Sequence, residues 1–109
     1  LKQASEFYVV DNSLNNIGRA AKSLDRSSYP ARRTVKFKSP RGVENVYNPQ
    51  LNNRSALVVE VSKGKSISNQ TLFFDFNFYL DNPEKVAEEG NYEISLKKYS
   101  KSVNASVVS

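Results

Sequence analysis

The spacing of apolar residues changes once along this chain, and that change limits the folds it can adopt. In residues 1–26 the apolar positions recur every three or four residues, at Phe7, Val10, Leu14, Ile17, Ala21 and Leu24. This spacing is typical of one face of an amphipathic helix. The opposite face is polar, with Asp11, Asn15, Arg19 and Lys22. We expect the helix to end before Pro30, because a proline disfavours the α conformation in the residue that precedes it.

After Pro30 the apolar residues fall at every second position, which is the period of a half-buried β-strand. Turn-forming residues separate six such segments, which we predict to be strands over residues 33–38, 43–48, 56–62, 70–80, 91–99 and 103–107, with a polar loop over residues 50–55. Residues 70–80 have the strongest pattern and should form the central strand of the core. One side of that strand would carry Leu72, Phe74, Phe76, Phe78 and Leu80.

The order of these elements predicts an α+β fold. Helices do not alternate with strands along the chain, which argues against a parallel βαβ arrangement. We therefore expect an N-terminal amphipathic helix over residues 1–28, packed on an antiparallel β-sheet or small β-sandwich over residues 29–109. A length of 109 residues fits one globular domain.

The composition excludes several kinds of chemistry. The chain has no His, Cys, Met or Trp, so a Ser-His-Asp triad, a thiol nucleophile and a thiolate or imidazole metal site are impossible. No glycine lies in a phosphate-binding loop motif. The carboxylates of Glu60, Asp75 and Glu93 could form an acid–base set, but we interpret them as outward-facing strand residues. The sequence predicts no catalytic residues, no metal site, no cofactor and no enzymatic activity.

Basic residues concentrate in one stretch of a chain that carries 16 Lys and Arg against 11 Asp and Glu. The stretch contains Arg26, Arg32, Arg33, Lys36, Lys38 and Arg41. The aromatic residues Tyr29 and Phe37 lie among them, a mixture found on strands that bind single-stranded nucleic acid. Phe37 should share the buried face with Val35, however, so we interpret the stretch as a solvated strand face that could contact a polyanion or another subunit.

Acidic residues concentrate in a second stretch, over residues 75–93, where Lys85 is the one basic residue. The members we consider as an acidic subunit contact are Glu84, Glu88, Glu89 and Glu93. The two charged stretches could pair across neighbouring strands of one domain or between copies of the chain. Three N-x-[ST] sequons, at Asn53, Asn69 and Asn104, are candidate glycosylation sites if the protein is exported.

Several short phrases carry a resemblance to a known family. They follow the helix in the order Arg33-Thr-Val-Lys-Phe37, Ser39-Pro-Arg-Gly-Val-Glu-Asn-Val-Tyr47 and Glu89-Gly-Asn-Tyr-Glu-Ile94. This order of parts resembles the ectodomain of archaeal type IV pilin-like proteins, which are made with a class III signal peptide.

The resemblance implies a non-enzymatic subunit or minor component of a filament at the extracellular cell surface. Its partners would be other filament subunits, held through an apolar helical segment upstream of Leu1, which would also be its one contact with the membrane. The family's important residues lie mostly in that segment, so none is assigned here. Two other functions stay open: a basic β-domain that binds nucleic acid or another polyanion, and an extracellular adhesion or ligand-binding sandwich domain.

Overall fold

One α-helix, one short 3-10 helix and eight strands make up the described part of the chain in a computed structural model. The structure describes residues 2–28 and 30–108, without the side chains of residues 2–7 and 63. The elements are, in order, α1 (Lys2–Asp25), β1 (Ala31–Ser39), β2 (Val43–Tyr47), β3 (Gln50–Leu51), β4 (Arg54–Lys63), β5 (Ser66–Phe74), β6 (Asn77–Asp81), the 3-10 helix η1 (Pro83–Ala87), β7 (Gly90–Lys98) and β8 (Ser102–Val107). The predicted α+β class is confirmed.

The strands form two sheets. The first sheet has the order β1-β7-β8-β6, and in the second sheet β4 pairs with β5 along one edge and with β2 and β3 along the other. Every pair is antiparallel except β6 with β8, which is parallel. This pair departs from the predicted antiparallel arrangement, because η1 carries the chain past β8 to β7 and β8 then returns between them.

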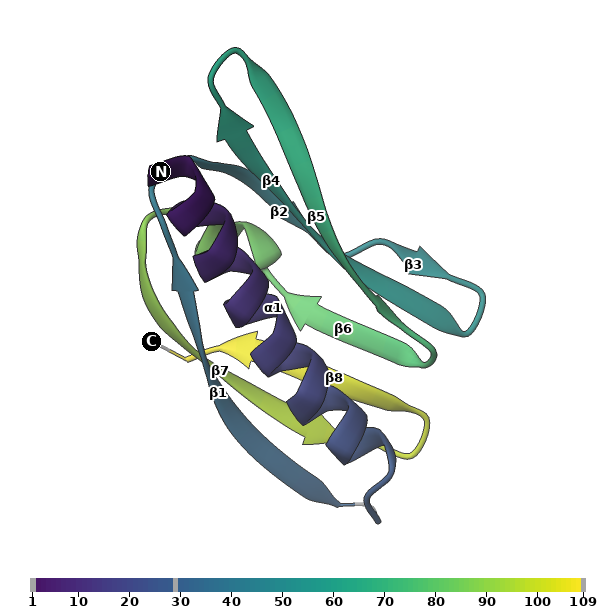
Figure 1. Cartoon of the computed structure of the whole chain (residues 1–109). Helices are drawn as coiled ribbons and strands as arrows, with labels where there is room; N and C mark the ends of the chain where they lie inside the picture. The colour runs from purple at the N-terminus through teal and green to yellow at the C-terminus, as the bar shows by residue number, and fades with distance from the viewer. Residues whose placement is uncertain (1, 29, 109) are drawn as a thin grey trace.

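Helix α1 lies across both sheets (Figure 1) and contacts strands of each. The predicted stripe is buried at Val10, Leu14, Ile17, Ala21 and Leu24, whereas the side chain of Phe7 lies outside the described ones. The stripe packs on buried residues of the two sheets, including Phe37, Leu57, Val59, Val61, Ile94 and Leu96. The apolar periodicity of the sequence therefore located the helix side of the core correctly.

The prediction of one central strand over residues 70–80 is wrong. The chain bends at Asp75 and Phe76, so that β5 belongs to the second sheet and β6 to the first, each at an edge. Phe74 and Phe78 are buried and their rings stack at a centroid distance of 4.3 Å. Phe76 is half-buried and meets the Phe74 ring edge-on at 5.4 Å. Because both sheets face one core, the alternation of apolar residues continues unbroken through the bend. The sequence pattern therefore gives no sign that the chain passes from one sheet to the other.

The predicted loop over residues 50–55 is a tight hairpin of β3 and β4. Asn53 adopts a left-handed backbone conformation with φ of 56° in this turn, which asparagine tolerates better than most residues. The hairpin matters because it places Gln50 and Ser55 beside β6 of the other sheet.

Side-chain hydrogen bonds join the two sheets along β6. Asn48 Oδ1 accepts from the Leu80 N–H at 2.8 Å, and its Nδ2 donates to the Ala56 carbonyl at 2.7 Å. Ser55 Oγ accepts from the Phe78 N–H, and Gln50 Nε2 donates to the Phe78 carbonyl, both at 2.9 Å. These bonds, which we call the β6 seam, satisfy backbone groups that an edge strand would otherwise leave open.

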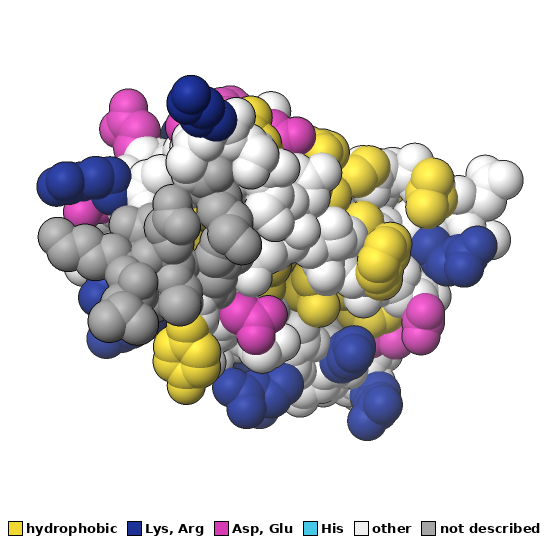
Figure 2. Space-filling view, turned by 45° about the horizontal axis from the view of Figure 1, so that its top comes forward, with side chains coloured by type: hydrophobic (Ala, Val, Ile, Leu, Met, Phe, Trp, Pro, Cys, Tyr) yellow, Lys and Arg dark blue, Asp and Glu magenta, His cyan; other side chains and the backbone are white. Residues whose placement is uncertain are grey.

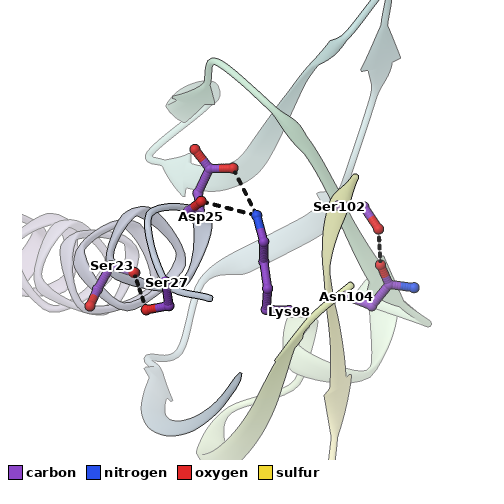
Figure 3. A network of polar contacts seen from close by, with 6 residues as sticks. All are labelled: Ser23, Asp25, Ser27, Lys98, Ser102 and Asn104. Atoms are coloured by element: carbon purple, nitrogen blue, oxygen red, sulfur yellow. Dashed lines mark hydrogen bonds and ion pairs between the residues drawn. The ribbon is translucent and has the colours of Figure 1, made fainter. Parts of the chain in front are cut away.

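At its C-terminal end, helix α1 is held by Lys98 of β7 (Figure 3). The Lys98 Nζ donates to the Asp25 carbonyl at 3.0 Å and lies 3.5 Å from Asp25 Oδ1. The last carbonyls of a helix lack partners within the helix, and a cation there also complements the helix dipole. Lys98 therefore fixes this end of α1 to the first sheet.

Ser13 fixes the middle of α1 to β1 through a buried hydroxyl. Its Oγ donates to the Lys38 carbonyl and accepts from the Lys38 N–H, both at 2.9 Å. We expect Ser13→Ala to lower the free energy of unfolding by about 1–3 kcal/mol, because two backbone groups lose their partner. Urea unfolding measures this loss, with Asn15→Ala on the exposed face of α1 as the control. Equal effects of the two substitutions would contradict the assigned role of Ser13.

Candidate functional site

The outer face of the first sheet, turned away from the core, carries most of the predicted basic site. Arg32, Lys36 and Lys38 alternate along β1 with residues that face the core. Arg33 falls on the same side as Val35 and Phe37 by strand parity, although its own side chain is exposed. Arg41 lies beyond β1, in the turn that leads to β2. The structure thus brings together three of the five predicted basic residues on one sheet face.

Cross-strand pairing extends this face over four strands. Arg32 lies opposite Lys97, Lys97 opposite Asn104, and Asn104 opposite Tyr79. All four side chains are exposed, and that of Tyr79 is 42% exposed. Sequence reasoning missed Lys97 and Tyr79, although the alternation of each strand already pointed both side chains outward. We call Arg32, Lys36, Lys38, Lys97 and Tyr79 the polar face.

Two acidic residues from the second charged stretch meet this basic stretch. Lys36 lies opposite Glu93 across the β1–β7 pair. The Arg41 Nε lies 3.8 Å from Glu89 Oε1, and both side chains are largely exposed. The charged stretches are therefore adjacent within one chain, as one of the two predicted arrangements required. An exposed ion pair such as Arg41–Glu89 contributes about 0–1 kcal/mol, so it affects local charge more than stability.

The remaining acidic candidates are Glu84, in η1, and Glu88, which follows it; both are exposed. The backbone carbonyl of Glu88 accepts a hydrogen bond from the Tyr92 hydroxyl at 2.8 Å. Burial, followed by the charge of the nearby Glu88 carboxylate, raises the pKa of Tyr92.

The aromatic residues of the basic stretch do not form a base-stacking surface. Phe37 is 1% exposed and faces the core, as predicted, so its ring is closed to a ligand. Tyr29 lies outside the described residues. The polar face therefore offers cations and the ring of Tyr79 to a ligand. The negative charge of Glu93, opposite Lys36, would repel an anion that binds there.

The structure does not bring together the carboxylates considered for acid–base chemistry. Glu93 lies on the outer face of the first sheet, Glu60 on β4 of the second, and Asp75 at the bend after β5. Glu60 Oε2 accepts a hydrogen bond from the Tyr47 hydroxyl at 3.4 Å. Burial, followed by the charge and the hydrogen bond of Glu60, raises the pKa of Tyr47. Among the described residues, no three His, Cys, Asp or Glu side chains are grouped as a metal site.

The three sequons differ in accessibility. Asn53 lies in the β3–β4 turn, and Ser55, the hydroxyl residue of its sequon, is buried in the β6 seam. Asn69 is exposed on β5. Asn104 is exposed on β8, where its Oδ1 accepts from Ser102 Oγ at 2.8 Å (Figure 3). All three asparagine side chains are exposed, and the Asn53 sequon differs from the other two in that its hydroxyl residue is buried.

Hydrophobic side chains also reach the surface on strands of the second sheet, among them Leu51, Ile67 and Phe73. In the view of Figure 2, yellow side chains gather on the right half of the surface, with Lys and Arg side chains mainly around its margin. Among the described residues, no helix combines the length and the apolar character that crossing a membrane requires.

Comparisons of the chain with protein families, with curated proteins and with solved structures gave no match.

Proposed function

We propose that this chain is the ectodomain of a non-enzymatic, type IV pilin-like subunit or minor component of a surface filament. The observation that carries the proposal is the docking of α1, a 24-residue amphipathic helix, along both sheets. Ser13 and Lys98 fix the helix to the β-domain that follows it. In a filament, such a helix would hold the exposed domain in a fixed orientation relative to the filament core. The three phrases that resemble archaeal pilin-like proteins support the same assignment.

The proposed assembly uses a segment of helix upstream of Leu1. The stripe from Val10 to Leu24 is already buried against the chain's own sheets. Subunit association would therefore depend on an apolar extension of α1, where hydrophobic burial supplies the driving force. The same extension would give the protein its contact with the membrane before assembly.

The charged candidates take a secondary role in this proposal. Arg32, Lys36 and Lys38 face outward from the first sheet, and Glu84 and Glu88 are exposed near η1. Contacts of opposite charge between neighbouring ectodomains would orient subunits rather than hold them together, because exposed ion pairs are weak and screened by salt.

The test is the coding sequence upstream of Leu1, together with the location of the protein. We expect a short basic leader followed by about 20 apolar residues, the length that spans a bilayer. Filaments sheared from the cell surface should then contain this chain in quantities above the cytosolic fraction. A coding sequence that starts near Leu1, with the protein retained in the cytosol, would overturn the proposal.

The polar face supports a second candidate, binding of a polyanion such as single-stranded nucleic acid. Arg32, Lys36, Lys38 and Lys97 present four cations on the same sheet face as the exposed ring of Tyr79. Cations that follow phosphates beside an aromatic ring are the elements of a single-strand binding surface.

We expect this binding to be weak. A single-stranded oligonucleotide should bind with a Kd of about 10⁻⁴–10⁻⁶ M at physiological salt, the range of non-specific binding. Affinity should fall as salt rises, and Lys36→Ala/Lys38→Ala should reduce the salt slope, whereas Lys85→Ala in η1 should not. Fluorescence anisotropy measures both quantities. A nanomolar Kd that depends on Tyr79 would favour the polyanion-binding function over the filament subunit.

A further inference from the structure

The edges of the two sheets are protected in different ways. β1 carries four exposed cations, and the backbone of Lys38 is bonded to Ser13 of α1. β6 is closed by the β6 seam. The strands β2 and β3 are short, and an irregularity between Val43 and Asn45 interrupts the pairing of β2 with β4. Charge, covering groups, short length and bulges are the devices that keep a sheet edge from pairing with another chain.

The edge formed by β5 differs from the others. Its nine residues, Ser66–Phe74, include no charged residue, no proline and no glycine. Among the described strands, β5 pairs with β4 alone. Figure 1 shows the β4–β5 hairpin projecting beyond the end of α1. A long, uncharged, projecting edge is a surface suited to pairing with a further strand.

The outward side chains of β5 add an apolar component to this edge. Phe73 is 70% exposed and Ile67 is 58% exposed. Helix α1 covers the other side of the strand, where Leu72 lies against Gly18. The helix therefore leaves the outward side of β5 to the solvent.

The β5 sequence is complementary to itself when two copies run antiparallel with Gln70 opposite Gln70. That register places Ile67 opposite Phe73 of the second copy, and Asn69 opposite Thr71. It also brings Lys65, in the β4–β5 turn, close to Asp75, at the bend that follows β5 of the second copy. Each of these pairs occurs twice by symmetry. Apolar pairs directly across two strands are stabilising, and the opposite charges of Lys65 and Asp75 attract at both ends of the paired strands.

We infer that β5 is a self-docking edge through which two copies of this chain form a closed, two-fold dimer by antiparallel β5–β5 pairing. The described part of each copy presents one such edge, so the assembly ends at two copies rather than growing into a fibre. The dimer is independent of any segment upstream of Leu1, and the inference therefore goes beyond the filament function and stands or falls separately from it.

Sedimentation equilibrium of the 109-residue chain tests the dimer and the charge pairing. We expect wild type to reach the dimer mass as concentration rises. Lys65→Glu and Asp75→Lys should each weaken association at least tenfold, because each places like charges close to one another, and the double variant should restore it. Lys85→Glu serves as the matched charge change away from β5. A wild type that remains a monomer up to its solubility limit, or that forms larger species, would overturn the inference.

Disulfide trapping tests the register. The chain contains no cysteine of its own, so each variant carries a single thiol at a chosen position. Residues directly opposite across antiparallel strands lie within the range that a disulfide spans. An equimolar mixture of Asn69→Cys and Thr71→Cys, made without N-glycans, should yield mainly the mixed dimer under mild oxidation. Ser106→Cys on β8 should not cross-link with either. Equal amounts of all possible disulfides, from variants with wild-type circular dichroism spectra, would contradict the pairing.

Discussion

Replacement of Phe78 by alanine should lower the free energy of unfolding by about 3–5 kcal/mol. Phe78 is completely buried, and its ring stacks on Phe74 at 4.3 Å, so it joins β6 of the first sheet to β5 of the second. Alanine would remove this contact and leave a cavity that the two sheets cannot close without moving apart. Because small domains are stable by about 5–15 kcal/mol, the loss would be a large share of the total. The urea midpoint at constant m-value measures it.

The matched control for Phe78 is Phe73, which belongs to the same aromatic-rich segment but points outward. Its side chain is 70% exposed, so Phe73→Ala should change stability by no more than about 0.5 kcal/mol at low protein concentration, where association does not contribute. A Phe73→Ala loss as large as that of Phe78→Ala would show that the facing of this segment is wrong.

The second large effect is expected at Asn48. Alanine there would remove the acceptor of the Leu80 N–H and the donor to the Ala56 carbonyl, at 2.8 and 2.7 Å. We expect a loss of about 1–3 kcal/mol, the cost of leaving partly buried backbone groups without partners. Asn12→Ala, on the exposed face of α1, provides the control.

Amide hydrogen exchange distinguishes this local role from a general loss of stability. In Asn48→Ala the Leu80 amide should exchange faster than the amides of β7, because its one described side-chain acceptor is gone. An unchanged protection pattern, together with an unchanged urea midpoint, would mean that Asn48 does not hold the β6 seam.

The helix and most of the strands were predictable because the spacing of apolar residues within each segment shows its period. The stripe from Val10 to Leu24 and the alternation of Val35 and Phe37 identify the buried faces of α1 and β1. Residues 70–80 were misassigned because every second side chain faces the shared core both before and after the bend at Asp75. A bend between two sheets that share a core leaves the period unchanged.

The bonds that connect the sheets were not predictable from local patterns. Ser13 and its partner Lys38 are separated by 25 positions, and Asn48 and Leu80 by 32. In the sequence Ser13 is only a weak helix former and Asn48 only a residue that precedes a proline. Their partners depend on which elements become neighbours in space, and that information is long-range.

The candidate site shows the same division. Strand alternation predicted correctly that Phe37 faces inward and Lys36 and Lys38 outward. The position of Glu93 opposite Lys36 follows from the pairing of β1 with β7, strands that are far apart in the sequence. Sequence analysis could therefore offer the two charged stretches as partners, but it could not choose the register in which they meet.

The order of strands also decides how mechanical tension would travel through this molecule. The chain enters the first sheet at β1 and leaves it at β8, and β7 lies between these two strands and pairs with both. Because β1 and β8 both run antiparallel to β7, a pull between α1 and the end of β8 acts along the strands, in shear, on many hydrogen bonds at once. The second sheet is inserted in the sequence between β1 and β6, outside this path. Stretching would therefore strain the polar face and the end of α1 first, while the β4–β5 hairpin keeps its shape under load.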